Sequence, residues 1–327
     1  MARLDHGSRR SIWWPTAAAG VLLAVASVTV LLSTAAAELR YTVVSGHGDV
    51  PLNVVSAGDA GKPPLLLIHG IGQSHVSFEE QLKPVLTDEF HVVTFDLRGH
   101  GNSGKPWEAA AYTESLSWAG DVRAIIDTLA LERPVLLGWS YGTLVVADYV
   151  RQYGSGDLAG IVLTGGYGGL TPPPPPPDPD VAAVFARNRA LQLSADPNEN
   201  AAAARAVAAM LTSRDMGEDW RLRASQIAMM LPAYARAHMF TRSFASMDLI
   251  PAIEVPLLLV VGGRDSGTPE APARELAAKL QAQGVYVAVS VYPESGHSPF
   301  SEEPDRFNRE LALFARDARA KSIPNVR

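Results

Sequence analysis

The residues best suited to chemistry begin with a serine held between two glycines. Residues 138–142 read Gly-Trp-Ser-Tyr-Gly, after an apolar run and before a helical pattern. This G-x-S-x-G context is typical of a sharp strand-to-helix turn that lifts the hydroxyl of Ser140 into solvent. The helix that starts there also aims backbone N–H groups at developing negative charge. The pattern predicts a nucleophilic serine, although a glycine turn without chemistry would have the same composition.

Two later residues complete a possible catalytic set. Asp265 follows the apolar run 257–261, and His297 follows the last predicted strand, residues 285–291. In open parallel sheets ligands bind at the carboxyl edge of the strands, where both side chains and Ser140 would meet. We therefore predict that His297 acts as the general base and that Asp265 orients its imidazole.

A glycine turn earlier in the chain predicts an oxyanion hole. Residues 69–72 read His-Gly-Ile-Gly and follow the predicted strand 65–68. Such a turn can aim the backbone N–H of Ile71 at the position that the N–H of Tyr141 also faces. Two donors of this kind are expected in acyl transfer, and losing one commonly costs about 3 kcal/mol in the transition state.

Short apolar runs alternate with helical patterns along the chain, which predicts a mostly parallel sheet with helices on both faces. The predicted strands are an opening hairpin of residues 41–45 and 52–57, followed by residues 65–68, 91–95, 135–137, 161–163, 256–261 and 285–291. We expect helices after a capping Thr113, over residues 144–149, from Thr268-Pro269-Glu270 with the threonine as cap, and over residues 307–314.

With these motifs in place, the chain resembles the capped, lipase- and esterase-like α/β-hydrolases. The resemblance covers about residues 41–315 and includes the loop 96–103, Asp-Leu-Arg-Gly-His-Gly-Asn-Ser. It implies an α/β fold with an eight-stranded mostly parallel sheet, the Ser140–Asp265–His297 triad and a pocket under a helical cap inserted between two strands. A serine at position 140 argues against the related dehalogenases and epoxide hydrolases, which carry an aspartate there.

Other polar residues near these motifs are weighed as alternatives. Asp96 could supply the triad acid, but its loop resembles a structural one. The equivalent position after the strand 161–163 is occupied by Thr-Gly-Gly-Tyr and offers no carboxylate. His69 and His100 lie in glycine turns and are interpreted as structural, and Glu294 as a solvated neighbour of the catalytic imidazole.

Residues 170–247 are predicted to form the helical cap between the core segments 38–169 and 248–320. They begin with six prolines, residues 172–177, interpreted as a stiff extended spacer. Six of the seven methionines lie in this segment, as a helix-packing core or as an adaptable apolar wall. The candidate pocket residues are Trp139, Met229, Met230 and Phe240, and for Trp139 and Tyr141 simple packing is an equal alternative.

The amino terminus carries an export or membrane signature. Three arginines precede an uncharged apolar stretch, residues 12–37, and residues 8–13 resemble a twin-arginine signal. Residues 1–37 are therefore interpreted as a signal peptide, cleaved after Ala37, or as a retained anchor. Either reading places the enzyme outside the cytoplasm, while residues 321–327 are expected to be a loose tail.

These features together predict a serine hydrolase that cleaves an ester or related acyl bond of a small, hydrophobic substrate through an acyl-enzyme. The same triad would also serve a C–C bond, lactone or proline-amide hydrolase, and a catalytically slow binding protein could share the scaffold. No metal or cofactor is needed. The absence of cysteine excludes thiolate chemistry, and a net charge of −6 without a basic patch argues against a nucleic-acid partner.

Overall fold

The computed structural model describes residues 38–173 and 178–321. The predicted leader, part of the proline run and all of the predicted tail except Lys321, which ends a helix, lie outside them. Its centre is one eight-stranded sheet with the order β1-β2-β4-β3-β5-β6-β7-β8. The strands are β1 (Arg40–Ser45), β2 (Pro51–Ala57), β3 (Pro64–Ile68), β4 (His91–Phe95), β5 (Val135–Trp139), β6 (Gly160–Thr164), β7 (Leu257–Gly262) and β8 (Val287–Tyr292). Each predicted strand is present, with its ends shifted by at most two residues.

The pairing explains why the strand sequences look as they do. β1 pairs antiparallel with β2, and β2 with β4, whereas every other neighbour in the sheet is parallel. All five residues of β3, β4, β5 and β6 are buried, because helices cover both faces of the sheet there. The predicted α/β-hydrolase sheet, eight-stranded and mostly parallel, is thus confirmed.

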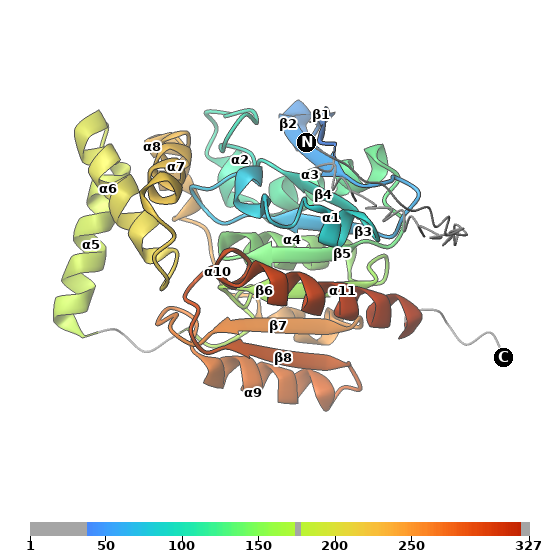
Figure 1. The fold of residues 1–327 in the computed structure, drawn as a ribbon. Coiled ribbons are helices and arrows are strands. Elements are labelled where there is room, and N and C mark those ends of the chain that lie inside the picture. The colour runs from blue at the N-terminus through green and yellow to red at the C-terminus, as the bar shows by residue number, and fades with distance from the viewer. Residues whose placement is uncertain (1–37, 174–177, 322–327) are drawn as a thin grey trace, which may run out of the picture. The chain divides into compact units, whose positions relative to one another are not determined.

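Helices follow most strands and cover both faces of the sheet (Figure 1). The α-helices are α1 (Pro84–Thr87), α2 (Ala110–Thr113), α3 (Ser115–Thr128), α4 (Tyr141–Tyr153), α5 (Pro179–Leu193), α6 (Pro197–Met210), α7 (Glu218–Met229), α8 (Ala233–Met239), α9 (Glu270–Gln281), α10 (Pro299–Glu302) and α11 (Pro304–Lys321). Short 3-10 helices are η1 (His47–Asp49), η2 (His75–Phe78) and η3 (Met247–Ala252).

The core consists of two apolar clusters, one on each face of the sheet. Alternate residues of β3 divide between them, with Leu66 and Ile68 in one cluster and Leu65 and Leu67 in the other. Residues of α3, α4 and α9 pack on the first face, and residues of α1 and α11 pack on the second. This two-sided burial fixes the strand ends that carry the candidate site.

Two helix starts differ from the sequence prediction. Thr113 ends α2 instead of capping α3, whose cap position is Glu114 without a side-chain hydrogen bond. Likewise Pro269 holds the cap position of α9, and the hydroxyl of Thr268 donates to the carboxylate of Asp265 at 2.5 Å. A carboxylate within reach accepts a stronger hydrogen bond than the helix end offers, so the hydroxyl turns to it.

Helices α5–α8 lie between β6 and β7 in the chain and stand together beyond the carboxyl ends of the parallel strands (Figure 1). α6 packs on α5 and α7, and α8 packs on α5 and α2. We call residues 179–239 the inserted helices. Among the helices of residues 38–173 and 178–321, none combines the length and apolar character needed to cross a bilayer.

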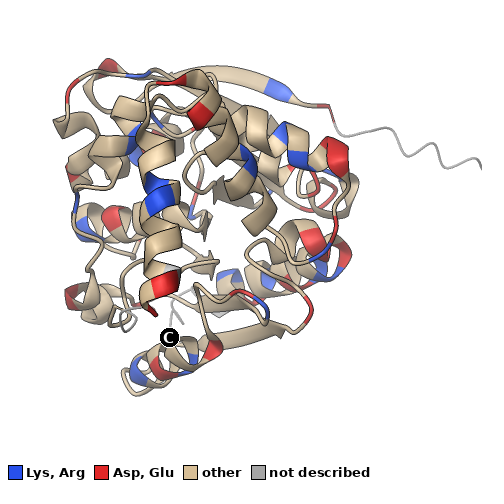
Figure 2. Cartoon of the chain, turned by 90° about the vertical axis from the view of Figure 1, so that its left-hand side faces the viewer, with Lys and Arg blue, Asp and Glu red and all other residues tan. Residues whose placement is uncertain are grey.

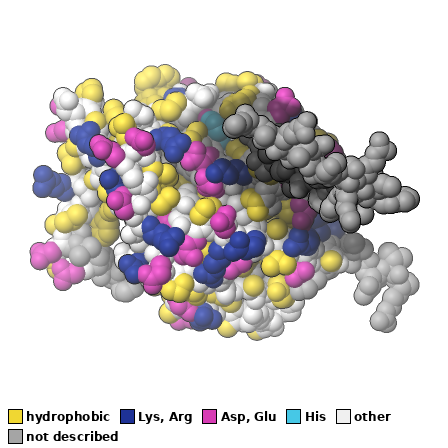
Figure 3. Space-filling model, viewed as in Figure 1, with side chains coloured by type: hydrophobic (Ala, Val, Ile, Leu, Met, Phe, Trp, Pro, Cys, Tyr) yellow, Lys and Arg dark blue, Asp and Glu magenta, His cyan; other side chains and the backbone are white. Residues whose placement is uncertain are grey.

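Charged side chains of both signs are interspersed on the described surface. Figure 2 shows Lys and Arg beside Asp and Glu over the inserted helices and the core. The face in Figure 3 has the same mixture. Exposed ion pairs of the described residues include Arg316 with Glu89 and Arg223 with Glu79. Such exposed pairs contribute little to stability.

Candidate active site

Ser140 lies in a strained turn between β5 and α4. Its backbone has φ 54° and ψ −118°, a left-handed conformation that non-glycine residues rarely adopt. The turn is possible because two glycines let backbone segments meet. A Cβ on Gly142 would lie 2.2 Å from the carbonyl oxygen of Ile68, and one on Gly138 would lie 2.6 Å from that of Gly142. Helix α4 is thereby pressed against the end of β3, which brings Ser140 to the carboxyl edge of the sheet.

Asp265 and His297 come together after β7 and β8. The Nδ1 of His297 and the Oδ2 of Asp265 are 2.7 Å apart. Asp265 also accepts hydrogen bonds from the backbone N–H of Gly267 at 3.0 Å and from the Thr268 hydroxyl. Burial alone would raise the pKa of Asp265, but the hydrogen bond from His297 and its other donors lower it below the usual value. The carboxylate therefore stays ionised and fixes the tautomer that leaves Nε2 of His297 free to accept a proton.

The end of β6 lies next to both the serine and the histidine. The backbone N–H of Ser140 donates to the carbonyl of Thr164 at 2.9 Å. The next residue, Gly165, has φ +60°, and a Cβ there would lie 3.1 Å from Cε1 of His297. On the other side, Nε1 of Trp139 donates to the carbonyl of His297 at 2.9 Å. The two catalytic candidates are thus anchored to the same strand end.

The glycine turn 69–72 lies against the serine, as the oxyanion-hole prediction requires. A Cβ on Gly70 would lie 2.9 Å from Cβ and 3.5 Å from Oγ of Ser140, so only glycine fits. Ile71 is the next residue of this turn. Tyr141 is the first residue of α4, and its N–H has no acceptor within the helix. The residues of the two predicted donors are therefore close to the serine, Tyr141 along the chain and Ile71 in the turn packed against it.

The imidazole of His69 supports the glycine turn 69–72, and its Nε2 carries no proton. Nδ1 lies 2.7 Å from the carbonyl oxygen of Gly70, and Nε2 accepts the backbone N–H of Leu97 at 2.9 Å. Because a backbone N–H can only donate, Nε2 must be unprotonated. Burial lowers the pKa of His69 to about 4. Burial also lowers the pKa of His100, whose ring packs edge-on against His69. Both histidines lie apart from the Asp265–His297 pair, in structural positions.

Asp96, the alternative acid, lies in a separate buried cluster. It accepts hydrogen bonds from the backbone and ring of His75 and from Asn53 and Asn102. Burial alone would raise the pKa of Asp96, but the hydrogen bond from His75 and the other donors hold it well below its usual range. Its role in the structure is to hold the loop after β4. Glu294 is exposed and paired with Arg264, as expected for a solvated neighbour.

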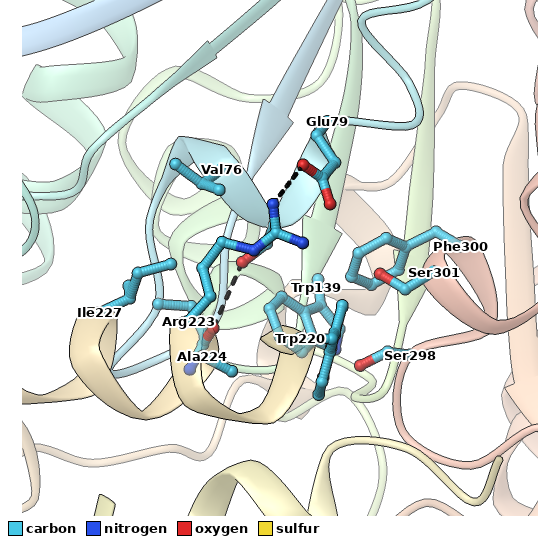
Figure 4. Close-up of a pocket in the computed structure, with 12 residues that line it drawn as sticks. Val76, Glu79, Trp139, Trp220, Arg223, Ala224, Ile227, Ser298, Phe300 and Ser301 are labelled. Atoms are coloured by element: carbon cyan, nitrogen blue, oxygen red, sulfur yellow. Dashed lines mark hydrogen bonds and ion pairs between the residues drawn. The ribbon is translucent and has the colours of Figure 1, made fainter. Parts of the chain in front are cut away.

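A small cavity of about 20 Å³ is lined by Trp139 and Ser298, the neighbours of Ser140 and His297 in the sequence. It has room for about one water molecule. Figure 4 shows Trp139, Phe300 and Ser298 on the side of the sheet and residues of α7 opposite them. Met229, Met230 and Phe240 do not line it. Met229 and Met230 are exposed at the end of α7, and the guanidinium of Arg189 lies 4.0 Å from the ring centre of Phe240. Of the four residues predicted to line the substrate pocket, only Trp139 lines this cavity.

Tyr141 packs instead of lining this cavity. Its ring lies edge-on against Trp118 and Phe244, and its hydroxyl accepts a long hydrogen bond of 3.4 Å from Arg242. Arg242 in turn forms a buried ion pair with Asp148 at 2.5 Å. The side chain of Tyr141 thus anchors the first turn of α4, while its backbone N–H faces the site.

Glu302 is a site residue that sequence reasoning missed. Its buried carboxylate accepts the backbone N–H of Gly296 at 2.8 Å through one oxygen. The other oxygen accepts the N–H groups of Ser213 and Arg214, at 2.8 and 3.0 Å. One carboxylate thus joins the loop that carries His297 to the turn before α7. No local pattern marks it, because its partners are backbone groups and two of the three lie nearly ninety residues away.

Residues of the described segments offer no group of three His, Asp or Glu side chains placed to hold a metal ion.

Comparison with known proteins gives the family. The model of the alpha/beta hydrolase fold matches residues 63–304. The chain belongs to the α/β-hydrolase family. It is 26% identical over 275 residues to the AB hydrolase superfamily protein YisY of Bacillus subtilis, covering 77% of this chain and 91% of that one.

Solved structures of esterases are similar to this α/β-hydrolase along most of its length. A protein of Burkholderia cenocepacia assigned as an aryl esterase has a TM-score of 0.76 and 31% identity, covering 85% of this chain and 99% of the other. The esterase RhEst1 from Rhodococcus sp. ECU1013 has a TM-score of 0.70 and 26% identity, covering 84% and 98%. These relatives support a hydrolase activity.

Proposed function

We propose that this protein is a serine esterase in which Ser140, His297 and Asp265 form the catalytic triad. The observation that carries the proposal is the 2.7 Å hydrogen bond between His297 and Asp265, beside a serine held in a strained turn. The esterase relatives described above support the choice of an ester bond. The inserted helices would act as a cap, since α7 faces Trp139 and Ser298 across the cavity.

The first half of the reaction forms an acyl-enzyme. The Oγ of Ser140 attacks the ester carbonyl carbon while its proton moves to Nε2 of His297. Asp265 stabilises the imidazolium that results. The carbonyl oxygen gains negative charge and accepts hydrogen bonds from the N–H groups of Ile71 and Tyr141. The tetrahedral intermediate then collapses, its bond to the alcohol oxygen breaks, and His297 returns the proton to the leaving alcohol.

Water completes the cycle. His297 takes a proton from a water molecule, whose oxygen attacks the acyl carbonyl. The second tetrahedral intermediate expels Oγ of Ser140, which recovers its proton from the imidazolium. In acylation and in deacylation the imidazole accepts one proton and then returns it. The tautomer that Asp265 fixes therefore serves both halves of the reaction.

The test is Ser140→Ala, assayed with p-nitrophenyl acetate and butyrate. We expect kcat to fall by roughly 10⁴- to 10⁶-fold, because removal of a triad nucleophile leaves only binding and the oxyanion donors. The folded state should persist, as measured by circular dichroism. Ser117→Ala, which removes a buried hydroxyl from α3, is the matched control and should keep full turnover.

Labelling supplies a second readout. A fluorophosphonate should modify the wild type at Ser140 and leave the alanine variant unlabelled. Turnover in Ser140→Ala close to that of the wild type would reject the proposed nucleophile.

A further inference from the structure

The three loops that carry the proposed chemistry each contribute a neighbouring residue to one cavity. Trp139 directly precedes the serine, and Ser298 directly follows the histidine. Gln73 directly follows the glycine turn 69–72, two residues after Ile71. Helix α7 forms the opposite wall (Figure 4). This placement makes the cavity a continuation of the reaction site, where one arm of a bound ester would lie.

Two polar atoms of this lining are buried without a partner. Nε2 of Gln73 and Oγ of Ser298 belong to side chains that are 3% and 1% exposed, and neither forms a hydrogen bond within the described part of the chain. Oε1 of Gln73 accepts a long hydrogen bond of 3.4 Å from Ser77, which leaves the amide nitrogen unpaired. Buried polar groups are almost always paired, so two orphans around one cavity indicate a ligand or a water that pairs them.

The chemistry of the two groups defines what they can bind. An amide nitrogen only donates hydrogen bonds, and a hydroxyl donates one. The shared complement is an oxygen that accepts both. A charged group is disfavoured, because the nearby Arg223 and Glu79 satisfy each other at 2.9 Å. Besides this ion pair the lining is mostly apolar, and its aromatic residues are Trp139, Trp220 and Phe300.

We propose that Gln73 and Ser298 form a specificity site that selects esters with an uncharged, hydrogen-bond-accepting oxygen on a short arm next to the scissile bond. An ether or keto oxygen fits this description, and the cavity of about 20 Å³ has room for that oxygen and little more of the arm. The proposal rests on the proposed esterase function and names the class of substrate that the same site prefers. A plain alkyl arm would leave both polar groups unpaired, which is how sites of this type reject analogues.

The experiment compares pairs of esters in which an oxygen replaces one methylene. For the acyl arm the pair is p-nitrophenyl methoxyacetate and p-nitrophenyl butyrate. For the alcohol arm it is 2-methoxyethyl acetate and butyl acetate. The quantity is the ratio of kcat/KM within each pair, compared between the wild type and each variant. Intrinsic reactivity and the fraction of active enzyme cancel in this comparison.

Ser298→Ala and Gln73→Met should each lower the ratio for one of the two pairs by roughly three- to tenfold, the effect of losing one neutral hydrogen bond. The pair that responds shows which arm enters the cavity. Ser298→Thr retains a hydroxyl and should keep most of the preference, whereas Ser117→Ala, remote from the cavity, should keep the wild-type ratio.

Unchanged ratios for both pairs in Ser298→Ala and Gln73→Met would overturn the proposal and assign the orphans to a bound water. That outcome differs from failure of the proposed function, in which none of the esters would be hydrolysed in a Ser140-dependent way.

Discussion

Acidification should destabilise this protein through His69 before it protonates most carboxylates. The folded state requires neutral His69, because Nε2 accepts the backbone N–H of Leu97. Burial lowers its pKa to about 4, against 6.5 in the unfolded chain. Between these values the unfolded chain binds a proton that the folded chain does not, so stability falls as the pH falls. The difference is about 2.5 kcal/mol between pH 7 and pH 4.5.

Other titratable groups also change the free energy of unfolding with pH, either in a lower pH range than His69 or in the same range. The pKa of Asp96 and that of Asp265 are lowered, so the stability they contribute is lost as the pH falls below about 4. His100 also has a lowered pKa and adds to the loss in the same window as His69. The loss between pH 7 and pH 4.5 should therefore exceed the contribution of His69 alone.

The assay is urea unfolding followed by tryptophan fluorescence at pH 7 and pH 4.5. His69→Gln removes the titrating group and should reduce the pH-dependent loss by about 2.5 kcal/mol, even though its stability at pH 7 is lower. His47→Gln changes an exposed imidazole and should retain the wild-type loss. An equal loss in wild type and His69→Gln would refute the reasoning.

Two substitutions test the supports of the site. Glu302→Gln replaces an acceptor of three backbone N–H groups, including that of Gly296, and should cost about 2–3 kcal/mol with a roughly tenfold lower kcat/KM. Its control is Glu303→Gln, which weakens one hydroxyl contact and a long ion pair with Arg306 at 3.9 Å, and equal kinetics in the two would contradict this role. Gly142→Ala would place a Cβ 2.2 Å from the Ile68 carbonyl, so we expect loss of more than about 3 kcal/mol in thermal unfolding and of turnover. A stable, active alanine variant would show that α4 can shift.

The sheet and the approach of the candidate residues could be predicted because their signals are local. Continuous apolar runs indicate buried parallel strands, and the motifs after them lie where such strands end. Residues 65–68 and 91–95 illustrate this, since the structure shows strands there with the same carboxyl ends. Burial on both faces leaves these runs no other stable arrangement.

The lining of the cavity could not be predicted from composition. The cluster of methionines led to the prediction that Met229 and Met230 line the pocket, but both are exposed at the end of α7. The residues of α7 that line the cavity are Trp220, Ala224 and Ile227. Their spacing of four and three residues places them on one side of this helix. Which side faces the sheet depends on tertiary packing, and the identity of the residues does not determine it.

Thr268 shows a different limit. A threonine before Pro-Glu fits the pattern of a helix cap, and the same hydroxyl also lies three residues from Asp265 in a tight turn. Both partners are local, so sequence spacing cannot choose between them. The hydroxyl donates to the carboxylate of Asp265 because a charged acceptor forms the stronger hydrogen bond. It therefore helps to hold Asp265 in place for His297.

The inserted helices and the loop that carries His297 are joined through one carboxylate. Glu302 binds the turn before α7 with one oxygen and the residue before His297 with the other. Helix α10 ends at this residue and starts directly after Ser298, so the same short segment lines the cavity and carries the bridge. Moving α7 to widen the cavity must break charge-assisted hydrogen bonds or shift the histidine loop. The shape of the cavity and the placement of the imidazole are therefore coupled, and on the proposed function changes in α7 that enlarge the cavity should alter kcat as well as KM.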